Sequence, residues 1–376
     1  MNGSAAVRRT ALLDIPFSAA VNDSVETARR HTLRWLRTFG LLPGEEAARE
    51  YDALRLERLM AAFYPGASSA DLCLACDFNG WFFVFDDQFD GRLGHRPRDV
   101  GPLVDRLVGC LGPAADSGSG LSTGLGADPP LVAAFRDVWL RASAGMPPFW
   151  RRRFAAHWRG YLESHRCEAM DRVTDEAPSL ERFLRVRRHS IGVRPCLDYG
   201  ERAGGCVLPE MLYSAPPLTT LRELTVDVVI FVNDLVSLDK ELAVGDMHHN
   251  SVLVLRSRTG CSLEEATARV SRLVNTRVAR FRQLADDLPR ALEERATPVR
   301  TRADVARCLD TMRDVMSGNL AWSLETARYD ASGVAAVSDG RERPWAGLVG
   351  SEAAVGEDGH GEDGRPLAGG PRPVPG

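Results

Sequence analysis

Apolar positions recur with the spacing of an amphipathic helix over most of the first 330 residues. Residues 25–39 combine this pattern with basic residues on the polar face, and the stretch Gly40-Leu41-Leu42-Pro43 provides a stop signal. The same periodicity predicts further helices at 45–64, 131–144, 149–170, 180–192, 221–244, 263–285 and 303–329. No strand-and-turn rhythm occurs elsewhere in the sequence, so the pattern predicts an all-α fold.

One apolar run is ambiguous when it is considered alone. Residues 228–232, VVIFV, are rich in β-branched side chains and could form a strand. The length of the surrounding apolar segment and the four-residue spacing of the polar positions beyond it favour a helix instead.

Two segments lack this apolar pattern. Residues 113–130 are rich in Gly, Ser and Asp, which predicts a surface loop between two helices. From about Asp330 onward the chain consists largely of Gly, Pro, Glu and Asp with few apolar residues, a composition typical of disorder. We therefore expect one helical domain over residues 1–330, followed by a disordered tail over 331–376.

Composition narrows the possible functions. The chain has 376 residues, of which 44% are hydrophobic, so it can build a large core. Its formal charge of −4 argues against general affinity for nucleic acid or anionic membranes. It has no apolar run of 18 residues, and Asp14 and Pro16 interrupt the N-terminal apolar stretch, which predicts neither a spanning helix nor a signal peptide. We expect a cytoplasmic monomer or homodimer.

The cysteines do not indicate a metal or redox site. Eight are scattered along the chain, and only Cys73 and Cys76 form a Cys-x-x-Cys pair. A zinc site would need a second pair or suitably spaced histidines, and a redox motif would need a βαβ context. We interpret this pair as two small core residues one helical turn apart.

Two sets of oxygen-bearing side chains carry the strongest chemical signal. Asp86 and Asp90 are four residues apart, as are Asn233, Ser237 and Glu241, so each set would form a stripe along one face of a helix. Mg²⁺ prefers oxygen ligands and is usually held by one or two carboxylates together with substrate phosphates. The two stripes therefore predict a magnesium-dependent site for a diphosphate.

The residues before each stripe strengthen this interpretation. The first stripe follows an apolar run at 81–85, and the second follows an almost wholly apolar run at 226–232. Carboxylates would be costly to bury there unless cations balanced them. Lys240, which lies within the second stripe, is the only lysine among 47 basic residues. A compact ammonium beside phosphate differs from a planar guanidinium, so this placement also points to an anion.

The two stripes resemble motifs of the bacterial class I terpene cyclases. Residues 86–90, DDQFD, are similar to the aspartate-rich motif of that family, which is a weak signature by itself. Residues 233–241 match the form N-D-x-x-S-x-x-K-E at every fixed position, which is a strong signature. The resemblance covers most of the chain. It implies a single-domain class I terpenoid synthase helical bundle around a central active-site cavity.

The resemblance also implies a set of metal ligands. Three Mg²⁺ ions would bind together with the substrate diphosphate, between the aspartate-rich motif and the Asn/Ser/Glu triad. Asp86 is the dependable ligand of the first motif, while Asp87 and Asp90 are candidates that need not touch metal directly. The candidates from the second motif are Asn233, Ser237 and Glu241.

Further residues are implied to bind the diphosphate. The segment 183–190, FLRVRRHS, is similar to the family segment whose arginine senses the diphosphate, and a distance of 46 positions before Asn233 selects Arg187, with Arg188 as the alternative. Arg328 and Tyr329 resemble an Arg-Tyr pair that closes over the diphosphate. Together with Lys240, these side chains would stabilise the charge on the leaving group.

Aromatic side chains would line the rest of the cavity. Ionisation of an allylic diphosphate also produces a carbocation, which needs a dry pocket and is stabilised by aromatic faces. Phe63, Phe82, Phe83 and Trp322 are the candidate wall residues. Ordinary core packing is a nearly equal explanation for these four.

The predicted function is cyclisation of farnesyl diphosphate to a sesquiterpene hydrocarbon or alcohol. Geranyl and geranylgeranyl diphosphate remain alternative substrates. A chain-elongating prenyl diphosphate synthase would carry a second aspartate-rich motif, and a class II cyclase would carry Asp-x-Asp-Asp; neither is present in the sequence. A di-iron bundle would need inward Glu-x-x-His pairs, and the only match lies at 357–360 in the predicted tail. A non-catalytic helical scaffold would leave the acidic stripes and the single lysine without explanation.

Overall fold

The computed structural model describes residues 5–90, 92–112, 128–173, 178–245 and 247–349. Within these ranges the chain forms helices joined by short connections, and no strand occurs, which confirms the all-α prediction. The helices are α1 (Ala5–Thr10), α2 (Val25–Thr38), α3 (Gly44–Ala53), α4 (Leu56–Phe63), α5 (Ser69–Asp86), η1 (Arg92–His95), α6 (Pro97–Gly109), α7 (Pro130–Ser143), α8 (Pro148–Arg172), α9 (Leu180–Ser190), α10 (Val193–Ala203), α11 (Glu210–Tyr213), α12 (Pro216–Val244), α13 (Ser251–Thr259), α14 (Leu263–Glu294), α15 (Val299–Glu325) and α16 (Ala331–Ser338).

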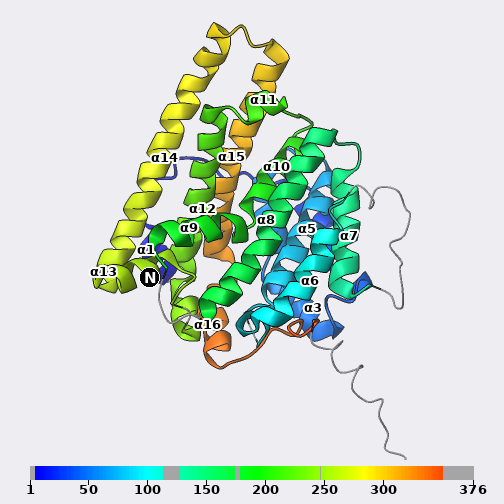
Figure 1. Cartoon of the computed structure of the whole chain (residues 1–376), viewed down its shortest axis with the longest axis vertical. Helices are drawn as coiled ribbons and strands as arrows, with labels where there is room; N and C mark the ends of the chain where they lie inside the picture. Colours follow the sequence, from blue (N-terminus) through cyan, green and yellow to red (C-terminus); the bar gives the residue numbers. More distant parts are fainter. Residues whose placement is uncertain (1–4, 91, 113–127, 174–177, 246, 350–376) are drawn as a thin grey trace, which may run out of the picture.

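Helix α12 is central to the bundle. It packs against α14 and α15 and also contacts α1, α9, α10, α13 and α16 (Figure 1). Because neighbours surround it, residues 226–232 are buried without interruption, which explains why the run 228–232 is apolar on every side of the helix. The ambiguous run at 228–232 is therefore helical, as predicted.

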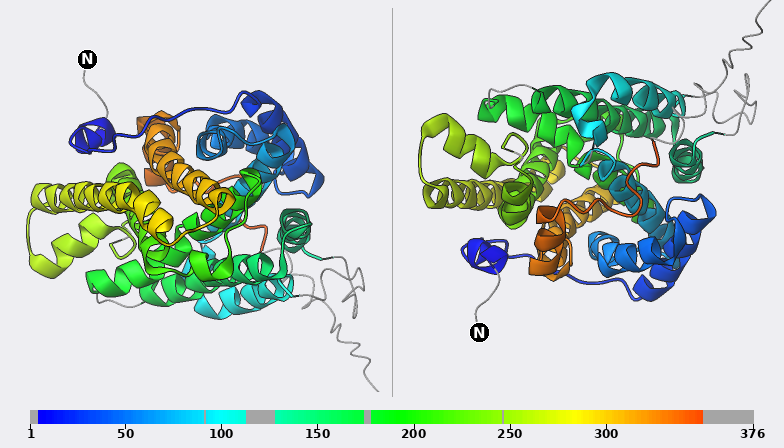
Figure 2. Two further views of the ribbon diagram at one scale, coloured as in Figure 1. Left: turned by 90° about the horizontal axis from the view of Figure 1, so that it is seen from above. Right: turned by 90° about the horizontal axis from the view of Figure 1, so that it is seen from below.

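A second group of helices faces α12. Helix α5 packs against α2, α4 and α7, and α8 packs against α6, α9 and α10. The views along the bundle show these helices arranged as a ring rather than as flat layers (Figure 2). No described helix combines the length and the apolar character needed to cross a lipid bilayer.

The predicted helix at 45–64 is wrong, because the chain breaks there into α3 and α4. Arg55 adopts a left-handed conformation with φ of 53°, and its guanidinium pairs with Glu57 and Glu26. The break turns the carbonyl of Leu54 toward α15, where it accepts hydrogen bonds from Trp322 Nε1 at 3.1 Å and from the Thr326 hydroxyl at 2.9 Å. No Gly or Pro marks this position, so the local sequence gave no signal.

The prediction of disorder from residue 331 is wrong for residues 331–349. This stretch contains α16, which packs against α12, and Trp345, whose side chain is only 1% exposed. One large aromatic residue is enough to anchor a segment whose average composition suggests disorder. Residues 350–376 lie outside the described residues, as does most of the predicted loop, at 113–127.

Candidate active site

A cavity lies inside the ring and is lined by residues of α4, α5, α8, α9, α10, α12 and α15. Its empty volume is about 1160 Å³, including the space at its open mouth. One part of the lining is apolar and aromatic, and the other part carries carboxylates and cationic groups.

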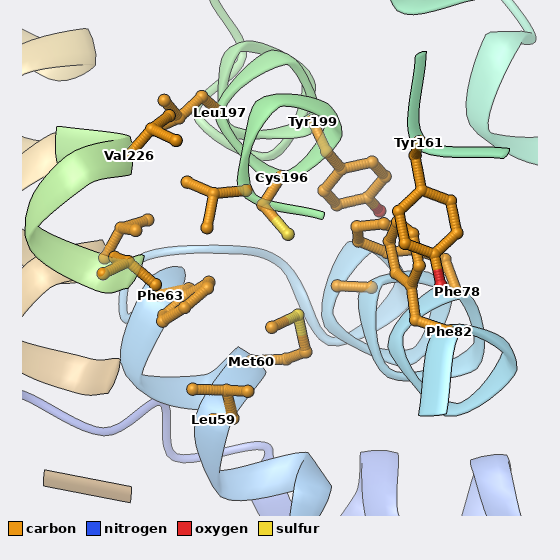
Figure 3. Packing of buried hydrophobic residues seen from close by; sticks show 14 of the residues in the cluster. Leu59, Met60, Phe63, Phe78, Phe82, Tyr161, Cys196, Leu197, Tyr199 and Val226 are labelled. Carbon is orange, nitrogen blue, oxygen red and sulfur yellow. The ribbon is translucent and has the colours of Figure 1, made fainter. Parts of the chain in front are cut away.

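All four predicted aromatic wall residues line the cavity. Phe82 stacks on Trp158 with ring centroids 4.5 Å apart and meets Tyr161 edge-on at 4.3 Å. In the close-up, Leu59, Met60 and Phe63 of α4 lie on one side and Phe82 and Tyr161 on the other (Figure 3). Phe83 and Trp322 pack edge-to-face at 5.7 Å and complete the wall near the polar part.

The turn between α9 and α10 also reaches the cavity. Gly192 has a φ of 72°, a conformation that glycine adopts without strain, and a Cβ atom at this position would lie 3.4 Å from the ring of Phe82. The predicted helix at 180–192 accordingly ends at Ser190, and the glycine reverses the chain into α10.

Asp86 is the last residue of α5, and its side chain is 46% exposed at the cavity. His165 of α8 places its Nε2 3.4 Å from Asp86 Oδ1, and its ring is buried between Phe85, Phe89 and Tyr161. Partial desolvation by the surrounding protein opposes ionisation, but the hydrogen bond and charge of His165 hold the pKa of Asp86 below its usual range.

Asp90 reaches the cavity from a turn and not from the expected helical stripe, because α5 ends at Asp86. Its Oδ2 accepts a hydrogen bond from Lys240 Nζ at 3.0 Å. Burial alone would raise the pKa of Asp90, but Lys240 and Arg328 lower it. Asp90 and Glu241 in turn raise the pKa of Lys240 against the effect of its own burial. Both groups are therefore charged near neutral pH.

Asp87, a candidate metal ligand, points away from the cavity. Each residue of a helix is rotated about 100° from its neighbour, so the residue after Asp86 faces a different side. Its buried carboxylate accepts one hydrogen bond from Arg328 Nη2 at 2.9 Å and one from Trp345 Nε1 at 3.0 Å. Both oxygens are thus occupied by side chains of the C-terminal part of the chain.

The second motif lies along α12. Asn233 and Glu241 line the cavity, whereas Ser237 is buried between them on the same helix and lies outside the cavity lining. Asn233 links two further candidates, since its Oδ1 accepts a hydrogen bond from Arg187 Nη2 at 2.9 Å and its Nδ2 donates to the hydroxyl of Tyr329 at 3.0 Å.

Asp234 holds the chain that follows this motif. It is buried, and burial raises its pKa. Its Oδ2 accepts a hydrogen bond from the backbone N–H of Ser251 at 2.8 Å, and its carbonyl accepts one from Asn250 Nδ2 at 2.7 Å. The residues after α12 are thereby fixed to the helix that carries Asn233.

The structure distinguishes Arg187 from Arg188. Arg187 lines the cavity, and its Nη2 lies 3.8 Å from a carboxylate oxygen of Asp234. Arg188 is turned toward Asp227 and donates to both of its oxygens, at 2.7 and 3.0 Å. Burial disfavours the charge on Arg187, but Asp234, Glu168 and Asp86 raise its pKa.

Arg328 and Tyr329 follow the end of α15 at Glu325, where the predicted helix extended to 329. The Arg328 side chain is 5% exposed, and its guanidinium lies 5.1 Å from the ring centroid of Phe83. Its Nη1 and the Nε of Arg187 are buried N–H groups with no hydrogen-bond partner among the described residues. Unpaired buried donors at a cavity indicate a place for an anion.

The sequence interpretation missed the contribution of α8. Tyr161, His165, Glu168 and Arg172 follow one another at spacings of four, three and four residues, and all but His165 line the cavity. This spacing, within the predicted helix at 149–170 for all but Arg172, is the signal that could have identified them. The aromatic and charged character of these residues left open whether the face was buried or exposed to solvent.

The donor set suits a metal–anion complex better than a metal site made of protein alone. Among the described residues, no group of three or more Asp, Glu, His or Cys side chains is placed to hold a metal ion. The cavity nevertheless combines Asp86, Asn233 and Glu241 with the unpaired donors of Arg187 and Arg328. Such a combination fits magnesium that shares its coordination sphere with phosphate oxygens.

Comparisons with known proteins agree with this geometry. The family described as "Terpene synthase family 2, C-terminal metal binding" matches residues 77–280. Pristinol synthase of Streptomyces pristinaespiralis is 56% identical over 342 residues, which cover 91% of each chain. Isoafricanol synthase of Streptomyces violaceusniger is 47% identical over 356 residues, covering 93% of this chain and 91% of that protein.

A solved structure extends the likeness to the fold. The crystal structure of germacradien-4-ol synthase from Streptomyces citricolor superposes with a TM-score of 0.73 at 31% identity, covering 84% of this chain and 98% of that one. The helical bundle, the polar motifs on α5 and α12 and these relatives lead to one assignment: the chain belongs to the terpene synthase family, as a bacterial class I member.

Proposed function

We propose that the protein is a sesquiterpene cyclase that ionises farnesyl diphosphate, cyclises the resulting carbocation and releases diphosphate. The observation that carries this proposal is a single cavity with an aromatic part and a polar part that contains unpaired buried N–H donors. Two relatives named as farnesyl diphosphate cyclising enzymes support the choice of substrate. They are a 7-epi-α-eudesmol synthase at 31% identity and a (−)-β-caryophyllene synthase at 33%.

The polar part would hold the diphosphate. Arg187 and Arg328 each supply a buried N–H group that has no partner among the described residues, while Lys240 and the hydroxyl of Tyr329 add a charge and a further hydrogen-bonding group. Fixed cations stabilise the charge that develops on the departing group, and each tenfold gain in rate requires only about 1.4 kcal/mol.

The side chains that would hold Mg²⁺ together with the diphosphate are those of Asp86, Asn233, Ser237 and Glu241. We propose three Mg²⁺ ions, the number implied by the resemblance to class I terpene cyclases. Bound Mg²⁺ would neutralise negative charge on the leaving diphosphate. Ser237 is buried and lies outside the cavity lining, so its hydroxyl would have to turn toward the cavity to bind a metal ion. Asp90 would act through Lys240, with which it is already paired.

The aromatic part would protect the carbocation. Phe63, Phe82 and Trp322 present apolar surface that excludes water, and an aromatic face stabilises a desolvated cation by about 2 kcal/mol. Phe83 lies between the two parts, because its ring also contacts the guanidinium of Arg328. The same residue would therefore border both the leaving group and the nascent cation.

Product analysis tests the proposal. The full chain is incubated with geranyl, farnesyl or geranylgeranyl diphosphate, with Mg²⁺ or with excess EDTA, and the extract is analysed by gas chromatography–mass spectrometry. We expect a cyclic C15 hydrocarbon or alcohol from farnesyl diphosphate, and none with EDTA. If only geranyl or geranylgeranyl diphosphate gave a cyclic product, that compound would be assigned as the substrate in place of farnesyl diphosphate. Formation of an elongated prenyl diphosphate would instead indicate a chain-elongating prenyl diphosphate synthase.

A further inference from the structure

The segment from Asp339 to Val349, here called the C-terminal strap, crosses the end of the bundle. Seen from below, it runs from α16 across the centre of this face toward the N-terminal helices (Figure 2, right). Two arginines attach it to α3, since Arg341 pairs with Glu46 and Glu50, and Arg343 pairs with Glu50 at 2.5 Å. The strap lies outside residues 77–280, which the family match covers.

Trp345 connects the strap to the aspartate-rich motif. Its indole is buried, packs edge-on against Tyr51 at 6.1 Å and donates a hydrogen bond from Nε1 to Asp87 Oδ2 at 3.0 Å. The next residue of the motif is also held, because Gln88 Nε2 donates to the Trp345 carbonyl at 2.8 Å. Gln88 Oε1 accepts from the backbone N–H groups of Gly347 and Leu348 at 3.0 and 3.1 Å.

Asp87 connects Trp345 to Arg328, a residue that lines the cavity. Its second oxygen, Oδ1, accepts from Arg328 Nη2, so an indole, a carboxylate and a guanidinium form a continuous chain of hydrogen bonds. The Nη1 of the same guanidinium is buried and has no hydrogen-bond partner among the described residues, and Arg328 lines the cavity. Asp87 accepts the hydrogen bond that orients the guanidinium of Arg328, which also lies 3.8 Å from Asp90 Oδ2 and 5.1 Å from the ring of Phe83.

We propose that Trp345 is a positioning residue for the diphosphate part of the active site, acting through Asp87 on Arg328; this inference rests on the proposed function. Without the indole N–H, one oxygen of a fully buried carboxylate has no donor. The carboxylate of Asp87 then rotates, so that both oxygens accept from Arg328 or one of them reaches solvent. The guanidinium of Arg328 consequently loses its fixed direction. A strap that serves only as a stability element would leave diphosphate binding unchanged.

Substitution Trp345→Phe tests the proposal, with Trp139→Phe as the matched control. Trp139 of α7 is also buried and stacks on Phe154, but its indole N–H has no partner among the described residues and it does not line the cavity. Both changes remove the same ring atoms, and only the first removes a donor to Asp87. Affinity for inorganic diphosphate in excess Mg²⁺ is measured by calorimetry, alongside kcat, KM and Tm.

We expect Trp345→Phe to raise the Kd of diphosphate and lower kcat/KM by about tenfold, the usual effect of losing a hydrogen bond to a charged group. Trp139→Phe should change both by less than about twofold, although each variant lowers Tm. In an Asp87→Ala background, Trp345→Phe should have no further effect on the Kd, because the two act in series. Equal diphosphate affinity of Trp345→Phe and Trp139→Phe would overturn the proposal.

A second variant keeps the test decisive. If Trp345→Phe does not fold, Arg343→Gln, which loosens the strap at its half-buried attachment to α3, should raise the Kd about two- to threefold by the same reasoning. An unchanged Kd for diphosphate in that variant would contradict the proposal that the strap positions the diphosphate site. Diphosphate affinity does not depend on cyclisation, so a wild-type protein that forms no terpene would defeat the proposed function and leave this comparison intact.

Discussion

The guanidinium of Arg187 donates to the side-chain oxygen of Asn233 over 2.9 Å, which joins a cation of the proposed diphosphate site to a proposed metal ligand. The same amide donates to Tyr329, so three candidates predicted from distant parts of the sequence form one network. Besides its proposed role as a metal ligand, Asn233 therefore links α9 to the C-terminal part of the domain.

This double role predicts the effect of removing the amide. Asn233→Ala deletes a proposed ligand and frees Arg187, and we expect turnover to fall on the order of 10²–10³-fold or more, as when a preorganised electrostatic group is removed. Glu241→Ala should give a similar loss. Circular dichroism should show the same helix content as the wild type. Near-normal turnover with either variant would refute the metal assignment.

The two adjacent arginines of α9 should behave differently. Arg187→Gln removes a donor at the cavity, so kcat/KM should fall at least about 100-fold with little change in Tm. Arg188→Gln removes two hydrogen bonds to the buried Asp227, which retains Arg277, and should cost about 1–2 kcal/mol of unfolding free energy with kcat nearly unchanged. The opposite ranking in steady-state kinetics would reverse the assignment.

A product change should separate wall residues from core residues. Phe82→Leu enlarges the cavity and removes an aromatic face, so we expect more acyclic or prematurely quenched product with ionisation largely retained. Phe78→Leu is the matched control, since Phe78 is buried against Phe82 but does not line the cavity. It should lower Tm while the product profile stays that of the wild type. If both variants gave the same product profile, Phe82 would be an ordinary core residue and would not act on the carbocation.

Stability should depend on pH through Glu201, which is remote from the proposed metal ligands. Burial raises its pKa to about 7, although Arg153 pairs with it at 2.7 Å. Because the pKa of the folded state is above that of the unfolded state, this group favours the folded state at low pH. Its contribution is then lost as the pH rises from about 4.5 to about 7.

Denaturant unfolding at a series of pH values checks this sign. Relative to wild type, Glu201→Gln should gain about 1–3 kcal/mol of unfolding free energy between pH 5 and pH 8, since glutamine carries no ionisable proton. Arg153, Asp198 and His157, which surround this carboxyl group, are present in both proteins, so the difference between the proteins reports the change at Glu201. A difference that stays constant with pH would show that Glu201 is ionised throughout.

The parts of the site that lie within one helix could be predicted from the sequence. The four-residue spacing that placed Asn233 and Glu241 on one face of α12 depends only on helical geometry. Asp87 could not be placed in this way, because its direction is set by the end of α5 and by two partners more than 240 positions away. The separation of 46 residues identified Arg187 only through resemblance to a known motif.

The other differences between the sequence predictions and the structure arise from tertiary contacts. The break at Arg55 has no local signal, since the structure stabilises it through hydrogen bonds to the Leu54 carbonyl from α15. Trp345 was overlooked because a composition average over a Gly- and Pro-rich stretch hides a single anchoring residue. A search for isolated large aromatic residues within such stretches would have identified it.

The position of Trp345 has a consequence for biosynthesis. Translation proceeds from the N-terminus, and helical units emerge and begin to pack before the ribosome reaches the last part of the message. The tryptophan that secures Asp87 is thus among the last described residues to be added. A nascent or prematurely terminated polypeptide that ends after α16 would carry every proposed metal ligand and Arg328, and yet lack the indole that secures Asp87. Catalytic competence would then be the final property acquired during synthesis.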